Sequence, residues 1–268
     1  MTAVMRVCVF GLGEAGSLIA SDLAMLPEVE VHGYDPAEVA TPAGVLRHDD
    51  PEAAAAGADL VLGITAAADA TAALAQALNA IPRGAVYAEL ATASAGLQRS
   101  LAATAAAAGL GFTDVALMSP VHGRGLRTPA LASGPSARAF IATMGPLGMP
   151  VEHAGDEPGM AATRKLLRSV VVKGLTALVL ESMQAAEAAG LAAETWDNIA
   201  RQLAAADEGF IHRLVTGTGR HAARRVHEME AAAELLAELG VEPIMTEATA
   251  ARLRSVAAGA SPVPSLPG

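Results

Sequence analysis

The sequence predicts an α/β protein with a doubly wound parallel sheet in its N-terminal part and an all-α C-terminal part that begins with one long interdomain helix. Three observations carry this prediction. Strand and helix patterns alternate up to about residue 155, a Gly-rich turn directly follows the first strand pattern, and nearly every later pattern is helical. We therefore expect a Rossmann domain over 1–155, a helical domain over 156–258 and a disordered tail over 259–268.

Composition restricts the classes of partner. The 268 residues are 52% hydrophobic and 3% aromatic, and the net charge is −10. An acidic chain without stretches that combine basic and aromatic residues does not suit nucleic acid or an anionic membrane. The one cysteine, Cys8, excludes an intrachain disulfide, and the N-terminus shows no signal-peptide pattern. We expect a soluble cytoplasmic protein with no nucleic-acid or membrane partner.

The Gly-rich turn has the setting that a dinucleotide requires. The apolar run Arg6–Phe10 is followed by Gly11, Leu12, Gly13, Glu14, Ala15 and Gly16, then by a helix pattern and a second strand that ends at Asp35. We expect all six turn residues to bind the pyrophosphate at the helix N-terminus. An acid 19 residues after Gly16 accepts hydrogen bonds from a ribose 2′-hydroxyl and repels a 2′-phosphate. This favours NAD and leaves NADP open, unless Asp35-Pro36 simply begins a turn.

The alternation continues with strand patterns at 59–65, 85–90 and 112–117 and helix patterns at 69–80, 94–108 and 135–144. Ligands of such a sheet bind beyond the carboxyl ends of its strands. The polar residues at or just after those ends are Thr65, Glu89, Thr92, Ser119 and His122.

The second half reads as helices at about 157–188, 192–206, 207–215, 219–239 and 244–258. The first of these would be roughly 48 Å long at about 1.5 Å per residue. A long helix that is apolar over much of its surface needs other helices around it, and this domain is small. We therefore expect a homodimer formed through the helical domain.

The two lysines of the chain, Lys165 and Lys173, both lie in this first helix, whereas the other 16 basic residues are arginine. At about 100° per residue they share one face with Ser169 and Thr176. Lysine, unlike arginine, exchanges a proton when burial shifts its pKa. This polar stripe is therefore the predicted chemical centre, although Lys165 could also extend from a partly exposed helix and Lys173 could form a surface ion pair.

Four segments in order resemble the β-hydroxyacid dehydrogenase superfamily, which includes 3-hydroxyisobutyrate and 6-phosphogluconate dehydrogenases. They are the Gly-rich turn, Glu89-Leu-Ala-Thr92, Asp114-Val-Ala-Leu-Met-Ser-Pro120 and Gly159-x5-Lys165. The turn and the lysine helix match the family closely, and the other two match in part. The pattern around Lys165 is similar to a poorly characterised bacterial branch related to 6-phosphogluconate dehydrogenase.

The resemblance implies that Lys165 exchanges a proton with the substrate oxygen while hydride moves to or from nicotinamide. We expect Thr92 and Ser119 to bind the substrate, although the family's serine falls at Met118, one place before Ser119. Thr65 and Thr92, which follow strand ends, are expected near the cofactor. We expect Leu166, Leu167 and Val170 to desolvate the lysine and lower its pKa.

Departures from the family define the expected substrate. Arg168-Ser169 replaces the family's Asn pair, and an arginine there suits a carboxylate or phosphate, unless it pairs with Asp156 or Glu157. Ser119, His122, Arg168, Ser169 and Lys173 are therefore the expected substrate residues beside Thr92, and the substrate is expected to be a small anion.

These residues predict an NAD(P)-dependent oxidoreductase acting on a small hydroxy acid or its carbonyl counterpart. One alternative is an imine reductase-like enzyme of the same fold, although those proteins usually place Asp or Tyr where this chain has Lys165. Another is a nicotinamide-binding sensor without turnover. No metal site is expected, because the seven histidines show no ligand spacing.

Overall fold

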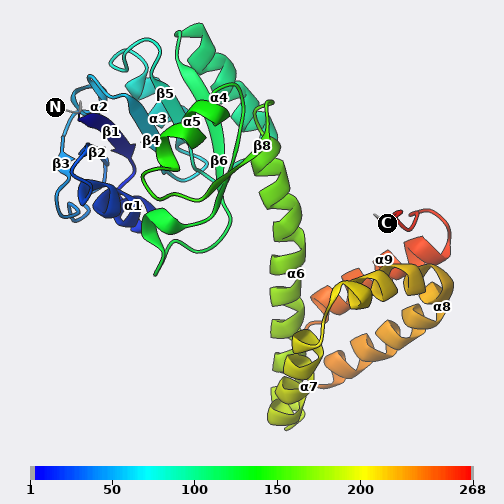
Figure 1. The fold of residues 1–268 in the computed structure, drawn as a ribbon. Coiled ribbons are helices and arrows are strands. Elements are labelled where there is room, and N and C mark those ends of the chain that lie inside the picture. The colour runs from blue at the N-terminus through cyan, green and yellow to red at the C-terminus, as the bar shows by residue number, and fades with distance from the viewer. Residues whose placement is uncertain (1–3, 267–268) are drawn as a thin grey trace. The chain divides into compact units, whose positions relative to one another are not determined.

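The computed structural model describes residues 4–266, and the chain divides into two units, Met1–Arg168 and Ser169–Gly268 (Figure 1). The division falls inside one continuous helix. The expected disordered tail, 259–268, ends in two residues that lie outside the described part. The rest of it, 259–266, contains no helix or strand.

An eight-stranded sheet forms the first unit, in the order β3-β2-β1-β4-β5-β6-β7-β8. Its strands are β1 Met5–Phe10, β2 Val29–Tyr34, β3 Leu46–Arg47, β4 Leu60–Gly63, β5 Val86–Glu89, β6 Gly111–Leu117, β7 Ala130–Ser133 and β8 Val151–Gly155. The first six in chain order pair in parallel, so the predicted fold class is confirmed.

Strand β7 departs from the wholly parallel arrangement, because it runs antiparallel to β6 with Leu117 opposite Ala130. For the next strand to run parallel, the chain must first cross back to the opposite end of the strands, usually through a helix. The segment between these strands holds only the short 3₁₀ helix η1, Gly125–Arg127, so the chain reverses direction at the end of β6 where it left the sheet. Strand β8 then pairs in parallel with β7.

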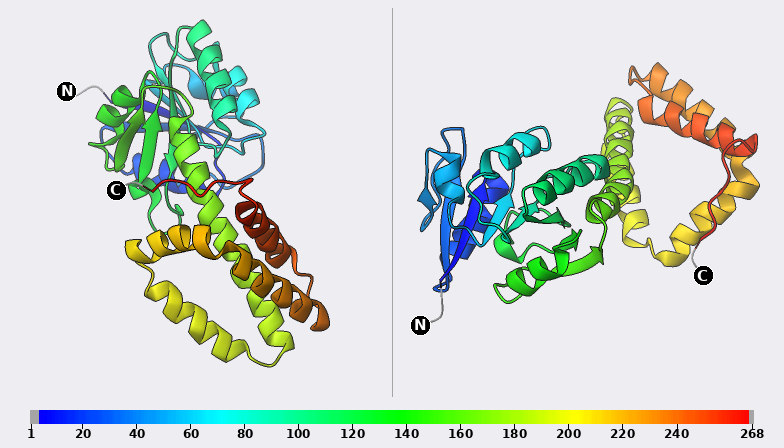
Figure 2. Two further views of the ribbon diagram at one scale, coloured as in Figure 1. Left: turned by 90° about the vertical axis from the view of Figure 1, so that its right-hand side faces the viewer. Right: turned by 90° about the horizontal axis from the view of Figure 1, so that it is seen from above.

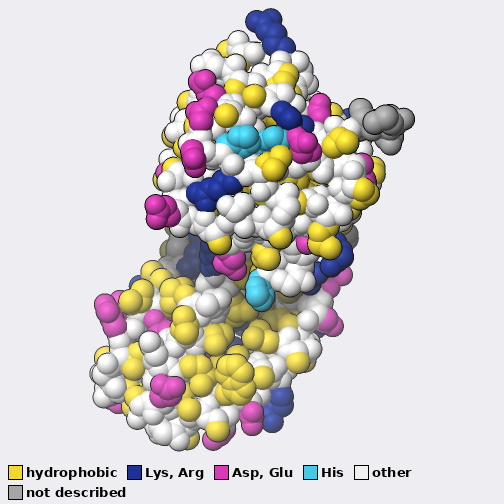
Figure 3. All heavy atoms as spheres, turned by 90° about the vertical axis from the view of Figure 1, so that its left-hand side faces the viewer, with side chains coloured by type: hydrophobic (Ala, Val, Ile, Leu, Met, Phe, Trp, Pro, Cys, Tyr) yellow, Lys and Arg dark blue, Asp and Glu magenta, His cyan; other side chains and the backbone are white. Residues whose placement is uncertain are grey.

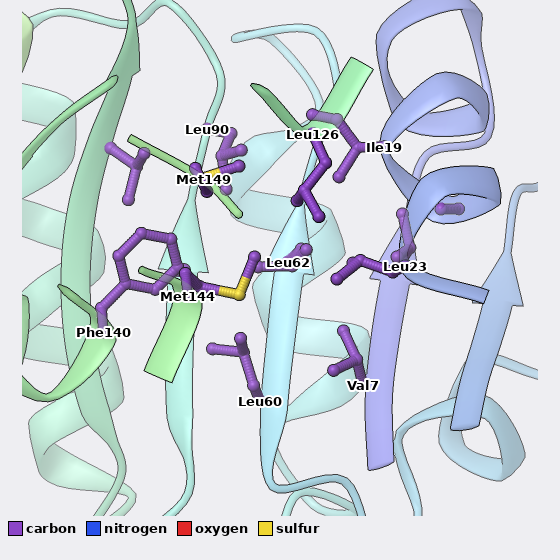
Figure 4. Close-up of a cluster of buried hydrophobic side chains, with 14 of the residues drawn as sticks. Val7, Ile19, Leu23, Leu60, Leu62, Leu90, Leu126, Phe140, Met144 and Met149 are labelled. Carbon is purple, nitrogen blue, oxygen red and sulfur yellow. The ribbon is translucent and has the colours of Figure 1, made fainter. Parts of the chain in front are cut away.

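Helices cover both faces of the sheet. They are α1 Glu14–Ala24, α2 Pro51–Ala55, α3 Ala70–Ala77, α4 Ala95–Ala107 and α5 Ala137–Met144. Alternate residues of β1 point to opposite faces, so Val7 and Val9 join one core while Cys8 and Phe10 join the other. Figure 4 shows the first of these cores, where side chains of α1 and α5 meet those of the strands.

The helical part consists of α6 Met160–Ala188, α7 Ala192–Ala204, α8 Glu208–Glu238 and α9 Ile244–Ala257 (Figures 1 and 2). Helix α8 is continuous where two helices, 207–215 and 219–239, were expected. Gly217 and Gly219 lie where the two expected helices would meet, and each lowers helix propensity by only about 1 kcal/mol. The buried Glu181 of α6 accepts hydrogen bonds from the N–H groups of Met245 and Thr246 and so caps α9.

The helical unit has an open apolar surface, and Figure 3 shows hydrophobic side chains gathered on the face that it presents. On α6, Val170 is 72% exposed and Val171 is 69% exposed. A groove of about 560 Å³ opens between helices of this unit, with Leu175, Leu178 and Leu235 among its lining residues. Within residues 4–266, no helix is both long enough and apolar enough to cross a membrane.

Candidate functional site

The Gly-rich turn between β1 and α1 can be built only with glycine at two of its positions. Gly11 has φ +93°, and a Cβ there would lie 2.3 Å from the Ile64 carbonyl oxygen. A Cβ on Gly16 would lie 1.8 Å from the Gly11 carbonyl oxygen, so α1 packs directly on the turn. These clashes explain why the chain keeps glycine here.

Gly13 faces open space, since nothing lies within 4 Å of its ideal Cβ position. It caps the N-terminus of α1, and no side chain occupies this cap. The first N–H groups of α1 are therefore available to a phosphate, which the helix dipole also favours. Leu12 is buried beneath the turn, while Glu14 is exposed and Ala15 half-buried.

Asp35 follows β2 and reaches back to the turn. Its Oδ2 accepts a hydrogen bond of 2.7 Å from the Leu12 N–H, and its Oδ1 accepts one of 2.9 Å from the Ala37 N–H. An ionised carboxylate has about four lone-pair sites, so two remain for a diol. The structure thus joins Asp35 to the Gly-rich turn, and these residues fit a nicotinamide dinucleotide with a free ribose 2′-hydroxyl.

The next two strand ends carry Thr65 and Thr92. Thr65 is half-buried and donates a hydrogen bond to the Ala66 carbonyl, and Thr92 is exposed after β5. Between them in the chain lies Glu89, which is fully buried and whose Oε1 accepts a 2.8 Å hydrogen bond from the Ala91 N–H. Burial raises the pKa of Glu89 to about 7, against hydrogen bonds from Ala91 and Tyr87 that lower it.

A buried carboxylate fixes the start of α6. Oδ2 of Asp114, on β6, accepts hydrogen bonds from the N–H groups of Gly159 (3.1 Å) and Ala162 (3.0 Å) and from the Ser133 hydroxyl (3.0 Å). The same hydroxyl accepts a 2.9 Å hydrogen bond from the Ala161 N–H. Together they satisfy donors of the first turn of α6 that have no partner within the helix.

Gly159 brings this turn against α4. Its φ is +92°, and a Cβ there would lie 2.8 Å from the Ala95 carbonyl oxygen and 2.9 Å from the Ala95 Cβ. The start of α6 is therefore packed on Ala95, the first residue of α4, which lies three residues after Thr92 in the chain. The glycine of the Gly-x5-Lys pattern is therefore needed for close approach as well as for its backbone conformation.

Lys165 and Arg168 lie on the part of α6 that belongs to the first unit, and Lys165 is half-buried. Arg168 does not pair with Asp156, which instead contacts His153 at 3.0 Å. Its Nη1 donates a 2.8 Å hydrogen bond to the Met118 carbonyl, at the end of β6. Arg168 is thus held at the base of the loop that carries Ser119.

This loop, residues 118–129, holds the remaining substrate residues of the first unit. Ser119 is half-buried with its hydroxyl 3.4 Å from the Pro120 carbonyl, and His122 is exposed. The loop is fastened to α1 by a 2.8 Å hydrogen bond from the Leu126 N–H to Asp22. A Cβ on Gly125 would lie 2.0 Å from that carboxylate, so this position also requires glycine.

The other expected substrate residues are not brought together by the first unit. Ser169 and Lys173 lie on α6 beyond the division, in the second unit, where Lys173 is exposed. The expectation that leucine and valine neighbours enclose Lys165 is wrong for the single chain. Leu166, Leu167 and Val170 are themselves 37%, 65% and 72% exposed.

Three features of the site were missed in the sequence. The capping role of Asp114 and Ser133 depends on partners more than 25 residues away, and the burial of Glu89 depends on its neighbours in the sheet. A buried-strand pattern that ends in an acid was the available signal for Glu89, whereas Asp114 lies in the middle of β6 and gave no such signal. Across residues 4–266, no group of three or more His, Cys, Asp or Glu side chains is arranged to hold a metal ion.

A turn restricted to glycine, an uncapped helix N-terminus and a carboxylate at the end of the next strand define a dinucleotide-binding Rossmann protein. Within that class, residues 6–125 match the NAD-binding domain of 6-phosphogluconate dehydrogenase, and residues 186–256 match a domain of unknown function, DUF1932. The chain thus carries an NAD-binding domain of the 6-phosphogluconate dehydrogenase type, and the resemblance to the β-hydroxyacid dehydrogenase superfamily is confirmed.

Solved structures share the fold along nearly the whole chain. An imine reductase from Myxococcus stipitatus in complex with NADP⁺ has a TM-score of 0.81 at 17% identity, over 95% of each chain. A variant of that enzyme is in complex with NAD⁺. A conserved protein of unknown function, described as structurally similar to 3-hydroxyacid dehydrogenases, has a TM-score of 0.59 at 26% identity, over 96% of this chain and 100% of the other.

A curated relative matches about half of the chain and points to no particular activity. An uncharacterized 28.5 kDa protein of Methanothermus fervidus is 26% identical over 138 residues, which are 52% of this chain. The match spans about half of that relative's length, at 53%. The fold family is therefore that of dehydrogenases and reductases that bind NAD or NADP, and the substrate has to be argued from the site.

Proposed function

We propose that this protein is an NAD(P)-dependent oxidoreductase that interconverts a small anionic hydroxy acid and its carbonyl counterpart, with Lys165 as the proton donor and acceptor. The observation that carries the proposal is the start of α6. Asp114 and Gly159 fix this turn against β6 and Ala95 of α4, and Lys165 follows less than two turns later. An ammonium group is thereby placed in the same unit as the dinucleotide turn.

The bound nicotinamide supplies or accepts the hydride. In the direction of reduction, the Lys165 ammonium donates a proton to the substrate oxygen, and in oxidation the neutral amine accepts the proton of the hydroxyl group. Arg168 binds the substrate anion, since it has five N–H donors and uses one on the Met118 carbonyl. Thr92 and Ser119 orient the substrate, and His122, Ser169 and Lys173 are the remaining proposed substrate residues.

The test removes the amine. Lys165→Ala is expected to lower kcat/KM by about 100-fold or more, the range of general acid–base catalysis, while the Kd for NADH changes by less than about threefold. Turnover would be followed at 340 nm with a panel of hydroxy acids and aldehydes and with both cofactors. Arg164→Ala is the control, because Arg164 is exposed on the preceding position of the same helix.

Turnover of Lys165→Ala within about threefold of the parent protein would refute the mechanism. Cyclic imines belong in the same panel, because imine reductases share this fold over 95% of the chain. A faster reaction with imines than with carbonyl acids would favour that alternative. Binding of cofactor with no absorbance change for any compound would favour a sensor.

The proposed assembly is a homodimer formed through the helical part. Its support is the uncovered apolar surface of α6 and the open groove of about 560 Å³ between helices of the second unit. Removing apolar surface such as these valine and leucine side chains from water is favourable by about 25 cal/mol per Å². A second copy presents the same surface and would cover this one isologously.

A further inference from the structure

We propose that Arg47, on the edge strand β3, positions Asp35 and thereby sets the preference of the dinucleotide site for a free ribose 2′-hydroxyl over a 2′-phosphate. The inference concerns cofactor binding by the NAD-binding domain and does not depend on the proposed role of Lys165. It assigns a specificity function to a residue outside the Gly-rich turn and outside β2.

The segment that presents Asp35 has no regular structure of its own. Between the end of β2 at Tyr34 and the start of β3 at Leu46, the chain forms no helix or strand. Backbone carbonyl groups in such a segment need hydrogen-bond donors from elsewhere. Without them, the segment would exchange among several conformations, and the carboxylate of Asp35 would not be held in one place.

Arg47 supplies these donors. Its Nη2 donates hydrogen bonds to the Ala37 carbonyl at 2.7 Å and to the Asp35 carbonyl at 3.2 Å, and its Nη1 donates to the Val39 carbonyl. One planar guanidinium group therefore binds three alternate carbonyl groups of the segment. A lysine ammonium on a flexible stem cannot reproduce this fixed fork.

The backbone that carries Arg47 is anchored to the sheet. Arg47 pairs with Gly33 in the parallel register of β2 and β3, and the N–H of the next residue, His48, donates a 2.9 Å hydrogen bond to the Gly33 carbonyl. Among residues 4–266, no carboxylate forms an ion pair with Arg47. The hydrogen bonds of the Arg47 side chain therefore go to backbone carbonyl groups at and beside Asp35.

The consequence for the ligand lies in the Asp35 carboxylate. One oxygen is held by the Leu12 N–H and the other by the Ala37 N–H, and Ala37 is also bound through its carbonyl by Arg47. A preorganised carboxylate accepts hydrogen bonds from a ribose diol at little entropic cost. The same charge repels a 2′-phosphate whether or not the segment is ordered, so ordering this segment strengthens the binding of NAD relative to that of NADP.

Arg47 could instead recognise a 2′-phosphate directly, since arginine binds phosphate bidentately. The two roles predict opposite results. If Arg47 positions Asp35, its removal weakens binding of NADH and spares NADPH. If Arg47 binds the phosphate, its removal weakens binding of NADPH and spares NADH.

The experiment titrates NADH and NADPH into the full-length protein and follows nicotinamide fluorescence, with calorimetry as a second measure. For Arg47→Met we expect the Kd for NADH to rise about tenfold while that for NADPH changes by less than about threefold. Arg47→Lys should likewise raise the Kd for NADH more than that for NADPH, because a lysine lacks the planar guanidinium group. Arg83→Met is the control, since Arg83 is an exposed arginine away from this segment.

A double-mutant cycle tests whether Arg47 acts through Asp35. In an Asp35→Asn background, Arg47→Met should change the ratio of the two Kd values by less than about threefold, because the discriminating charge is already absent. Circular dichroism and the melting temperature of each variant verify that it is folded. A larger loss for NADPH than for NADH, an equal loss for both, or an unchanged effect in the Asp35→Asn background would each overturn the proposal.

Discussion

At the scale of single residues, the first unit contains two buried carboxyl groups on neighbouring strands. Glu89 and Asp114 are register partners of β5 and β6, and both are almost fully buried. Burial raises the pKa of each above its ordinary value. Asp114 is used by the start of α6, whereas Glu89 holds the Ala91 N–H at the turn that leads to Thr92.

Glu89 makes stability depend on pH in a defined window. Its pKa is raised from 4.5 to about 7, so between these values the folded protein binds a proton that the unfolded chain does not. The contribution of Glu89 to the free energy of unfolding is therefore fully present below pH 4.5. It is lost as the pH rises to about 7, a change of about 3 kcal/mol. Glu89→Gln keeps the oxygen that accepts from Ala91 and removes the titration.

We expect Glu89→Gln to gain stability over the parent protein as pH rises from about 5 to about 8, the range that brackets the raised pKa. Urea unfolding at a series of pH values measures the difference, and Glu152→Gln, at an exposed position, is the control. A difference that stays constant across this range would show that Glu89 does not titrate there.

At the scale of elements, α6 begins where three parts of the first unit meet. Asp114 of β6 and Ser133 of β7 cap its first turn, and Gly159 packs that turn on Ala95 of α4. Each interaction joins residues far apart in the chain. Contacts with the sheet and with α4 therefore determine where the first turn of α6, which precedes Lys165, is held. This arrangement explains why residue 159, six positions before the lysine, is glycine.

Gly159→Ala is expected to lower the free energy of unfolding by about 2 kcal/mol or more. A left-handed backbone costs a residue with a Cβ about 1–2 kcal/mol, and the added Cβ would also meet the Ala95 carbonyl at 2.8 Å. Thermal and urea unfolding measure the change. Gly96→Ala, in the first turn of α4 where the nearest atom lies 3.8 Å from the ideal Cβ, is the matched control and should be neutral or slightly stabilising.

An equal effect of the two glycine substitutions would contradict the structural argument, because only Gly159 has a positive φ and a close neighbour. If Gly159→Ala remains folded, its kcat should fall more than its affinity for NADH. The reason is that the substitution displaces the turn before Lys165 and leaves the Gly-rich turn at α1 unchanged.

At the scale of the whole molecule, the proposed dimer makes the uncovered face of α6 an interior surface. Val171→Glu places a carboxylate on that face, where Val171 is 69% exposed in the single chain. We expect this variant to elute as a monomer while the parent protein has twice the chain mass by light scattering. A buried unpaired charge at an interface costs several kcal/mol, enough to dissociate the dimer at micromolar concentration.

Met25→Glu provides the control, because Met25 is 81% exposed at the end of α1 in the other unit. It should keep the mass of the parent protein. A monomeric parent protein, or a dimer that persists in Val171→Glu, would contradict the proposed assembly.

The sequence predicted the parts of the molecule that depend on neighbouring residues. The strand, Gly-rich turn and helix from Arg6 to Ala24, and Asp35 at the end of the next strand, were all readable because their spacing is local. The continuity of α8 through Gly217 and Gly219 was not readable. Each glycine disfavours the helix by only about 1 kcal/mol, and α8 gains stability from packing against α9 as well as from local preference.

By itself, the sequence determined the fold class, the dinucleotide turn and the helix that carries Lys165, because hydrophobic period and turn chemistry are written in consecutive residues. Only the tertiary structure decided that β7 runs antiparallel, that Asp114 caps α6 and that Arg47 binds the segment after Asp35. Each of these depends on a partner 8 to 48 residues away, and hydrogen bonds to a backbone carbonyl or N–H group leave no trace in the partner's residue type.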